Sequence, residues 1–150
     1  MQTVPGEVTG DPLWRSEVYR LALYAGHVAW DDASRLAKDP RTVKLSGQLY
    51  AAVGSIAATF AGGYSRQSHR DQARFYEYSL GSAREARVWY FHGQMILGPE
   101  TTEQRFRLLT SVIRLLLRII PAERAYVVRE DAAPYEPSTD GPVTAPPPDQ

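Results

Sequence analysis

Cysteine is absent from this chain of 150 residues, and lysine occurs only twice against fifteen arginines. Without cysteine, a disulfide scaffold and a thiolate metal site are both excluded. The first residues, MQTVPGEVTGDP, lack the basic start and apolar core of a signal peptide, which predicts a cytoplasmic location. The inward Glu-x-x-His pairs of di-iron bundles are also missing, so we expect no metal and no other cofactor.

Charge is missing from residues 45–65, LSGQLYAAVGSIAATFAGGYS, in a chain with 23% charged residues. A helix without a polar face must be covered on all sides, which predicts burial within an assembly of several copies. The polar residues and four glycines of the segment argue against a membrane span. At helical spacing one stripe is Leu45, Leu49, Val53, Ile56 and Phe60, and another is Gly47, Ala51, Gly54, Ser55, Ala58 and Gly62.

Apolar residues recur every three or four positions in four segments, which predicts helices over residues 12–38, 43–61, 69–97 and 101–120. Asp11 is the expected N-cap of the first helix and Ser68 that of the third. Gly62-Gly63, Gly98-Pro99 and Pro121 are the expected stops. Short connections favour antiparallel neighbours, so the predicted fold is an all-α up-down-up-down four-helix bundle over residues 11–125, after a flexible N-terminus, residues 1–10.

The C-terminal residues 129–150 contain six prolines and few aliphatic residues, which predicts a disordered tail. One arginine and five acidic residues give this tail a net charge of −4, so residues 1–128 carry +4. Residues 125–128, just before it, fit a short strand or a helical extension equally well. We expect the tail to dock onto a partner protein or to mask the basic part of the chain.

Small residues allow two helices to approach more closely than larger side chains do. We therefore predict that the small residues of 43–61 face a small patch of 69–97, namely Ser79, Ser82, Ala83 and Ala86. An alanine-rich composition alone is the alternative explanation. The residues expected in helix packing or in the contact between copies are Gln48, Ala51, Gly54, Ser55, Ala58, Phe60, Gly62, Phe75, Ser79, Ser82 and Ala86.

The stretch from residue 48 to residue 85 resembles a small bacterial four-helix-bundle family first known from open reading frames within intervening sequences of 23S ribosomal RNA genes. Two residues depart from that family's pattern, because Thr59 stands where asparagine is usual and Gly62 where glutamate is usual. The residues that match the pattern are Gln48, Leu49, Ser55, Ile56, Ala61, Gly63, Phe75, Gly81, Ser82 and Glu85.

This resemblance implies a homo-oligomer, typically a pentameric ring of bundles, without a known reaction. A distant branch of the family serves the reverse transcriptase of diversity-generating retroelements as an accessory protein, through basic surfaces that contact nucleic acid. Arginine forks suit phosphates, and a ring would repeat any basic row. A solvated face with weak ion pairs is the alternative interpretation. The candidate polyanion-binding residues are Arg66, Arg70, Arg74, Arg84, Arg87, Arg107, Arg114 and Arg118.

Signs of catalysis are few. Asp31 and Asp32 are adjacent, and adjacent helical residues do not face one another. Gly62-Gly63 ends a helix instead of following a strand, so it is not a phosphate-binding loop. The aromatic run Trp89-Tyr90-Phe91 cannot all point inward, and contact between subunits is its simplest use. The sequence therefore predicts a non-enzymatic scaffold or adaptor, with a nucleic-acid-binding accessory protein as the alternative.

Overall fold

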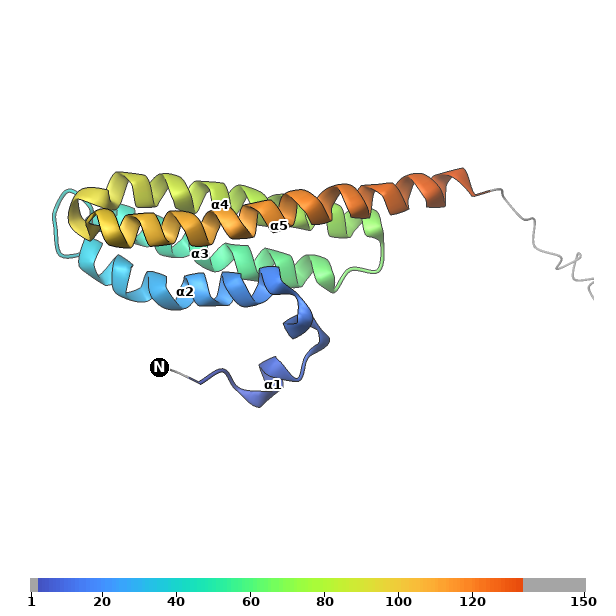
Figure 1. Cartoon of the computed structure of the whole chain (residues 1–150), viewed down its shortest axis with the longest axis horizontal. Coiled ribbons are helices and arrows are strands. Elements are labelled where there is room, and N and C mark those ends of the chain that lie inside the picture. Colours follow the sequence, from blue (N-terminus) through green and yellow to red (C-terminus); the bar gives the residue numbers. More distant parts are fainter. Residues whose placement is uncertain (1–2, 134–150) are drawn as a thin grey trace, which may run out of the picture.

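The computed structural model describes residues 3–133, in which four long helices run up-down-up-down (Figure 1). A single helical turn, α1, and a short 3₁₀ helix, η1, precede them. No strand occurs within residues 3–133, so the predicted all-α four-helix architecture is confirmed. The elements are α1 (Gly6–Thr9), η1 (Pro12–Arg15), α2 (Glu17–Leu36), α3 (Val43–Tyr64), α4 (His69–Leu97) and α5 (Pro99–Ala132).

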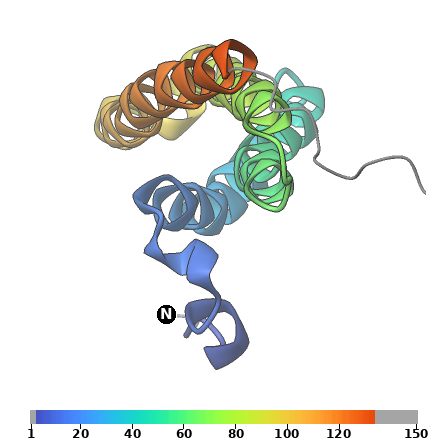
Figure 2. The same cartoon turned by 90° about the vertical axis from the view of Figure 1, so that its right-hand side faces the viewer.

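Seen along the bundle, α2, α3, α4 and α5 follow one another around an arc (Figure 2). Contacts are extensive between consecutive helices, whereas α2 meets α5 over a much smaller area. The centre of the core consists of Leu36, Leu49, Ile56, Leu109 and Leu116, all fully buried. Within residues 3–133, no helix has both the length and the apolar character that crossing a bilayer requires.

The predicted helix over residues 12–38 is wrong at its start, because Ser16 is extended, with φ −73° and ψ 121°. The Asp11 carboxylate accepts a hydrogen bond from the Leu13 backbone N–H at 2.8 Å, so this cap belongs to η1 instead of a long helix. The break allows Leu13 to turn into the core. Within the segment predicted to be flexible, Gly6–Thr9 forms α1.

The predicted end of the last helix before Pro121 is also wrong, since α5 continues through Pro121 to Ala132. A proline inside a helix costs about 3 kcal/mol. The extension lies beside the first turns of α4, where His69 Nδ1 is 2.5 Å from Glu123 Oε2 and the His69 ring stacks on Tyr126. The ion pair of Arg124 with Glu77 adds a further contact. These contacts offset the local cost, and they depend on residues about 50 positions away in the sequence.

The predicted disordered tail therefore begins too early, because Arg129 to Ala132 belong to α5. The rest of that prediction, residues 134–150, lies outside the described residues. Ser68 caps α4 as predicted, accepting from the Asp71 N–H at 3.1 Å. Gly98, with φ 83°, separates α4 from α5. The helix α5 begins at Pro99, two residues before the predicted start at residue 101.

Gly62 and Gly63 lie in the last turn of α3, which ends at Tyr64, and so they do not stop the helix where predicted. A Cβ on Gly63 would stand 2.7 Å from Phe75 Cβ and 3.0 Å from the ring of Tyr76. This close approach allows Tyr76 to stack on Phe60, with 4.7 Å between ring centroids. Gly63 is therefore required by packing between α3 and α4.

We expect Gly63→Ala to lower the free energy of unfolding by about 1–3 kcal/mol, because the added methyl overpacks the contact with Phe75 and Tyr76. Urea denaturation followed by circular dichroism measures the change. Gly62→Ala is the matched control, since its Cβ would meet the Phe75 ring at an ordinary 3.5 Å. Equal effects of the two substitutions would contradict the packing argument.

Candidate interaction surface on α2 and α3

The small residues of α3 lie on two different sides of the helix. Ser55 Oγ lies 3.1 Å from Ser82 Oγ of α4, and Ser79 donates to the Ile56 carbonyl at 2.8 Å. The predicted contact with α4 is therefore correct for these serines. It is wrong for the exposed residues Gly47, Ala51, Gly54 and Ala58. The reason is that Leu49, Val53, Ile56 and Phe60 occupy the core side, and helical spacing places the second stripe away from it.

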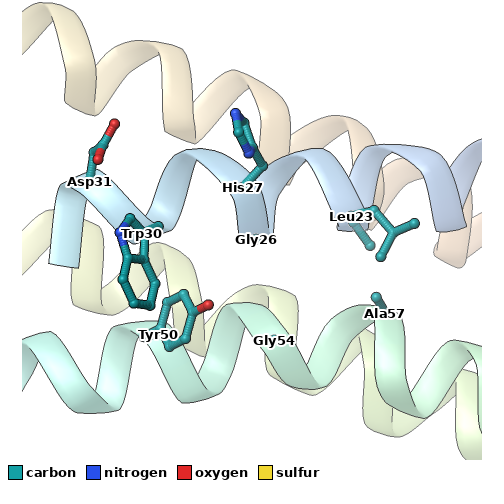
Figure 3. Close-up of a pocket in the computed structure, with 9 residues that line it drawn as sticks. Leu23, Gly26, His27, Trp30, Asp31, Tyr50, Gly54 and Ala57 are labelled. Atoms are coloured by element: carbon teal, nitrogen blue, oxygen red, sulfur yellow. The ribbon is translucent and has the colours of Figure 1, made fainter. Parts of the chain in front are cut away.

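Beside this exposed stripe, a groove of about 610 Å³ separates α2 from α3 (Figure 3). Gly26 on α2 and Gly54 on α3 lie opposite each other in its middle. Trp30 and Tyr50 close one end, in an edge-to-face pair with 5.7 Å between ring centroids. Both rings are large and solvent-accessible, with Trp30 63% and Tyr50 42% exposed. The groove thus combines exposed aromatic rings at one end with two glycines in its middle.

Packing within the chain does not explain the glycines of this surface. A Cβ on Gly26, Gly47 or Gly54 would meet nothing within 4 Å, whereas one on Gly93 would stand 2.9 Å from Leu36 Cδ2. A glycine in a helix interior costs roughly 0.5–1 kcal/mol relative to alanine. Glycine at these positions therefore lowers the stability of α2 and α3. It leaves open space on their surfaces that a larger side chain could occupy without a clash.

The eleven residues predicted for helix packing or for contact between copies do not form one site. Phe60, Ser79 and Ala86 are buried in the core. Gly62, Phe75, Ser55 and Ser82 are partly buried where α3 meets α4. Gln48, Ala51, Gly54 and Ala58 are exposed and share the surface of α3 with Gly47.

Several predicted polyanion-binding arginines already have partners. Arg66 lies in the loop before α4, and its guanidinium stacks on the Phe75 ring at 4.5 Å. Arg70 pairs with Asp131 at 3.1 Å, and Arg74 lies 4.0 Å from Asp71. Arg107 pairs with Glu103 at 3.2 Å.

A second, smaller groove of about 370 Å³ lies between α4 and α5. Arg84, Arg87 and Phe91 line it from α4, and Phe106 lines it from α5. Arg87 Nη1 donates to Thr110 Oγ1 at 3.3 Å, which directs its guanidinium toward α5. Within residues 3–133, Arg84, Arg114 and Arg118 form no ion pair.

The most tightly built polar cluster was not predicted from the sequence. Asp32 of α2 is only 2% exposed, and its Oδ2 accepts from Tyr90 Oη and from Arg105 Nε, both at 2.7 Å. Burial, together with the hydrogen bond to Asp32, raises the pKa of Tyr90 well above its usual range. Burial opposes the charge of Arg105, but the hydrogen bond and attraction to Asp32 outweigh it, so the pKa of Arg105 is raised.

This cluster joins α2, α4 and α5 at the end of the bundle where α2 and α5 meet. Because Asp32 and Tyr90 are fully enclosed, the cluster offers no accessible acid or base. The helical spacing of the sequence does indicate that Asp32 is buried. Asp32 lies on the same stripe of α2 as Ala25, Ala29 and Leu36, which are all buried. Asp31, the adjacent residue, lies outside this stripe and is exposed.

The fold and its surfaces define a small antiparallel four-helix protein whose polar centre is structural. Residues 16–126 match the 23S rRNA-intervening sequence protein family, and the chain belongs to that family, as its sequence predicted. A crystal structure of a protein of unknown function from the S23 ribosomal protein family of Bacteroides thetaiotaomicron has the same fold. It is 21% identical, with a TM-score of 0.65 over 69% of this chain and 97% of that one. No curated protein matches the chain.

Proposed function

We propose that this protein is a non-enzymatic scaffold or adaptor that assembles into a homo-oligomer through the exposed surface of α2 and α3. The observation that carries the proposal is the open glycine groove, which packing within one chain does not require. The resemblance to the family's rings makes five copies the expected number. A non-enzymatic role is supported by the burial of Asp32 and Tyr90, which are 2% and 1% exposed.

The chemistry of this surface suits contact between proteins. Aromatic residues are enriched in interface cores and charged residues are depleted there. Trp30 and Tyr50 are exposed, while the α3 positions Gly47, Ala51, Gly54 and Ala58 carry no charge. Small residues allow the helices of two copies to approach closely, and a Trp ring buries about 150–250 Å² when covered. A second copy would therefore cover these uncharged positions of α3, with Asp31 of α2 beside them in the groove.

We expect Ala58→Glu to dissociate the assembly into folded monomers of 16.8 kDa, because the side chain is exposed in one chain and would be buried between copies. An unpaired buried charge costs several kcal/mol. Light scattering after size-exclusion chromatography measures the mass. Ala125→Glu, at an exposed alanine of α5, is the matched control and should leave the assembly intact. A monomeric native protein at micromolar concentration would refute the proposal directly.

A nucleic-acid-binding accessory role is the second candidate, and the groove between α4 and α5 favours it. Proteins that bind single strands combine cationic grooves with rings on which bases stack. Arg84 and Arg87 supply charge there, and Phe91 and Phe106 supply rings. Arg114 and Arg118, which form no ion pair within the described part of the chain, add further positive charge on α5.

For this second role, Arg84→Ser with Arg114→Ser should weaken RNA binding in gel retardation. The slope of log affinity against log salt should fall by about 0.7 for each lost phosphate contact to a single strand. Arg70→Ser is the control, because the carboxylate of Asp131 already pairs with the Arg70 guanidinium at 3.1 Å. No retardation of RNA or DNA by the native protein at low salt would exclude this candidate.

A further inference from the structure

Another pocket lies between the N-terminal segment and α2, with a volume of about 410 Å³. Trp14 of η1 and Tyr19 and Tyr24 of α2 line it, so three aromatic rings border one cavity. Arg20 and His27 line the same pocket, and no acidic residue among residues 3–133 does. Arg20 Nη1 donates to the Trp14 carbonyl at 2.6 Å, which fixes the backbone of Trp14 beside α2.

Aromatic-lined grooves bind proline-rich segments, because such segments are already extended and lose little entropy on binding. Cationic side chains at the rim select for acidic neighbours of the prolines. The pocket therefore has the chemistry to bind a segment rich in proline and acidic residues. Tyr24, which is 49% exposed, presents a ring that a proline could cover.

We propose that the occupant of this pocket is the chain's own C-terminal segment, residues 134–150. This segment contains all six prolines of the region after residue 128, three of them consecutive at 146–148. It carries three acidic residues, Glu136, Asp140 and Asp149, and no basic residue. The prolines of this segment would contact the aromatic rings of the pocket, and its carboxylates would face the Arg20 guanidinium. This pocket adjoins the groove proposed for assembly, because Leu23 and His27 of α2 line both.

The extended length of the segment exceeds that of α2, the helix against which the pocket lies. It follows Ala133, just after α5 ends, and α5 ends toward the same end of the bundle at which α2 begins (Figure 1). Seventeen residues span about 50 Å in the polyproline conformation, at about 3.1 Å per residue. The whole of α2, with 20 residues, is only about 30 Å long. Attachment to the same chain also supplies an effective concentration in the millimolar range.

The indole N–H resonances of the full chain test this proposal, because only Trp14 of the three tryptophans lines the pocket. We expect Pro146→Ser, Pro147→Ser and Pro148→Ser together to shift the Trp14 resonance. Trp89, which donates to Glu85 Oε1 on the surface of α4, should not move and is the internal control. The shift should persist on dilution, because the contact is within one chain. An unmoved Trp14 resonance, or a shift lost on dilution, would overturn the proposal.

A pocket variant gives an independent readout. Tyr24→Ala removes an exposed ring, and cleavage of residues 134–150 by a nonspecific protease should become about tenfold faster as the released population rises. Tyr78→Ala on α4, where the tyrosine is 54% exposed, is the matched control and should leave the cleavage rate unchanged. Equal cleavage rates in native protein and Tyr24→Ala would contradict binding in this pocket.

Discussion

Asp32→Ala is expected to lower the free energy of unfolding by about 3–5 kcal/mol, the usual cost of removing one partner from a buried ion pair. The substitution leaves the Arg105 guanidinium, whose side chain is only 16% exposed, without its carboxylate. It also leaves the buried Tyr90 hydroxyl without its acceptor. Urea denaturation of the native and variant chains, followed by circular dichroism, measures the loss.

Two companion variants separate the parts of this effect. Tyr90→Phe removes one hydrogen bond to a charged acceptor and should cost about 1.5–3 kcal/mol. Asp31→Ala changes the exposed neighbour and should stay within about 0.5 kcal/mol of the native value. If Asp32→Ala were no more harmful than Asp31→Ala, the cluster would not hold α2 against α4 and α5.

Local sequence signals predicted the bounds of α4 well, because caps and breakers act within a few residues. Ser68 and Gly98-Pro99 mark the bounds of α4 to within one residue. Pro121 misled for the opposite reason. Its local cost is offset by His69, Glu77 and Arg70 of α4, which bind the extension from far away in the sequence. The expectation that proline ends a helix rests on neighbouring residues only, so it could not take these distant partners into account.

The same distinction applies to the candidate surface. Helical periodicity separated the larger apolar residues of α3 from the small ones, and the larger ones do form the core. Periodicity alone could not assign a neighbour to each face. Ser55 contacts Ser82, while Gly54 faces the groove with Gly26 and Trp30 of α2. Only the arrangement of α2 beside α3 brings those three residues together.

The glycine groove leads to a prediction in which fold stability and assembly change in opposite directions. We expect Gly54→Leu to raise the free energy of unfolding of a single chain by about 0.5–1 kcal/mol, because leucine favours the helix. No atom of the chain lies within 4 Å of the new Cβ. The same side chain would fill the groove that a second copy must enter. Overpacking of about 1–3 kcal/mol corresponds to a dissociation constant for assembly raised by about 5- to 150-fold.

Gly81→Leu is the matched control, because Gly81 is an exposed glycine of α4 that also has no atom within 4 Å of its would-be Cβ. It should give the same gain in helix stability and leave the assembly unchanged. Thermal unfolding of dilute protein reports the first quantity, and sedimentation over a concentration series reports the second. If Gly54→Leu and Gly81→Leu dissociated the assembly equally or not at all, the groove would not be the contact. If Gly54 served only the packing of its own chain, Gly54→Leu would not raise the stability of the fold while weakening assembly. Observing both changes together would therefore place Gly54 in the contact between copies.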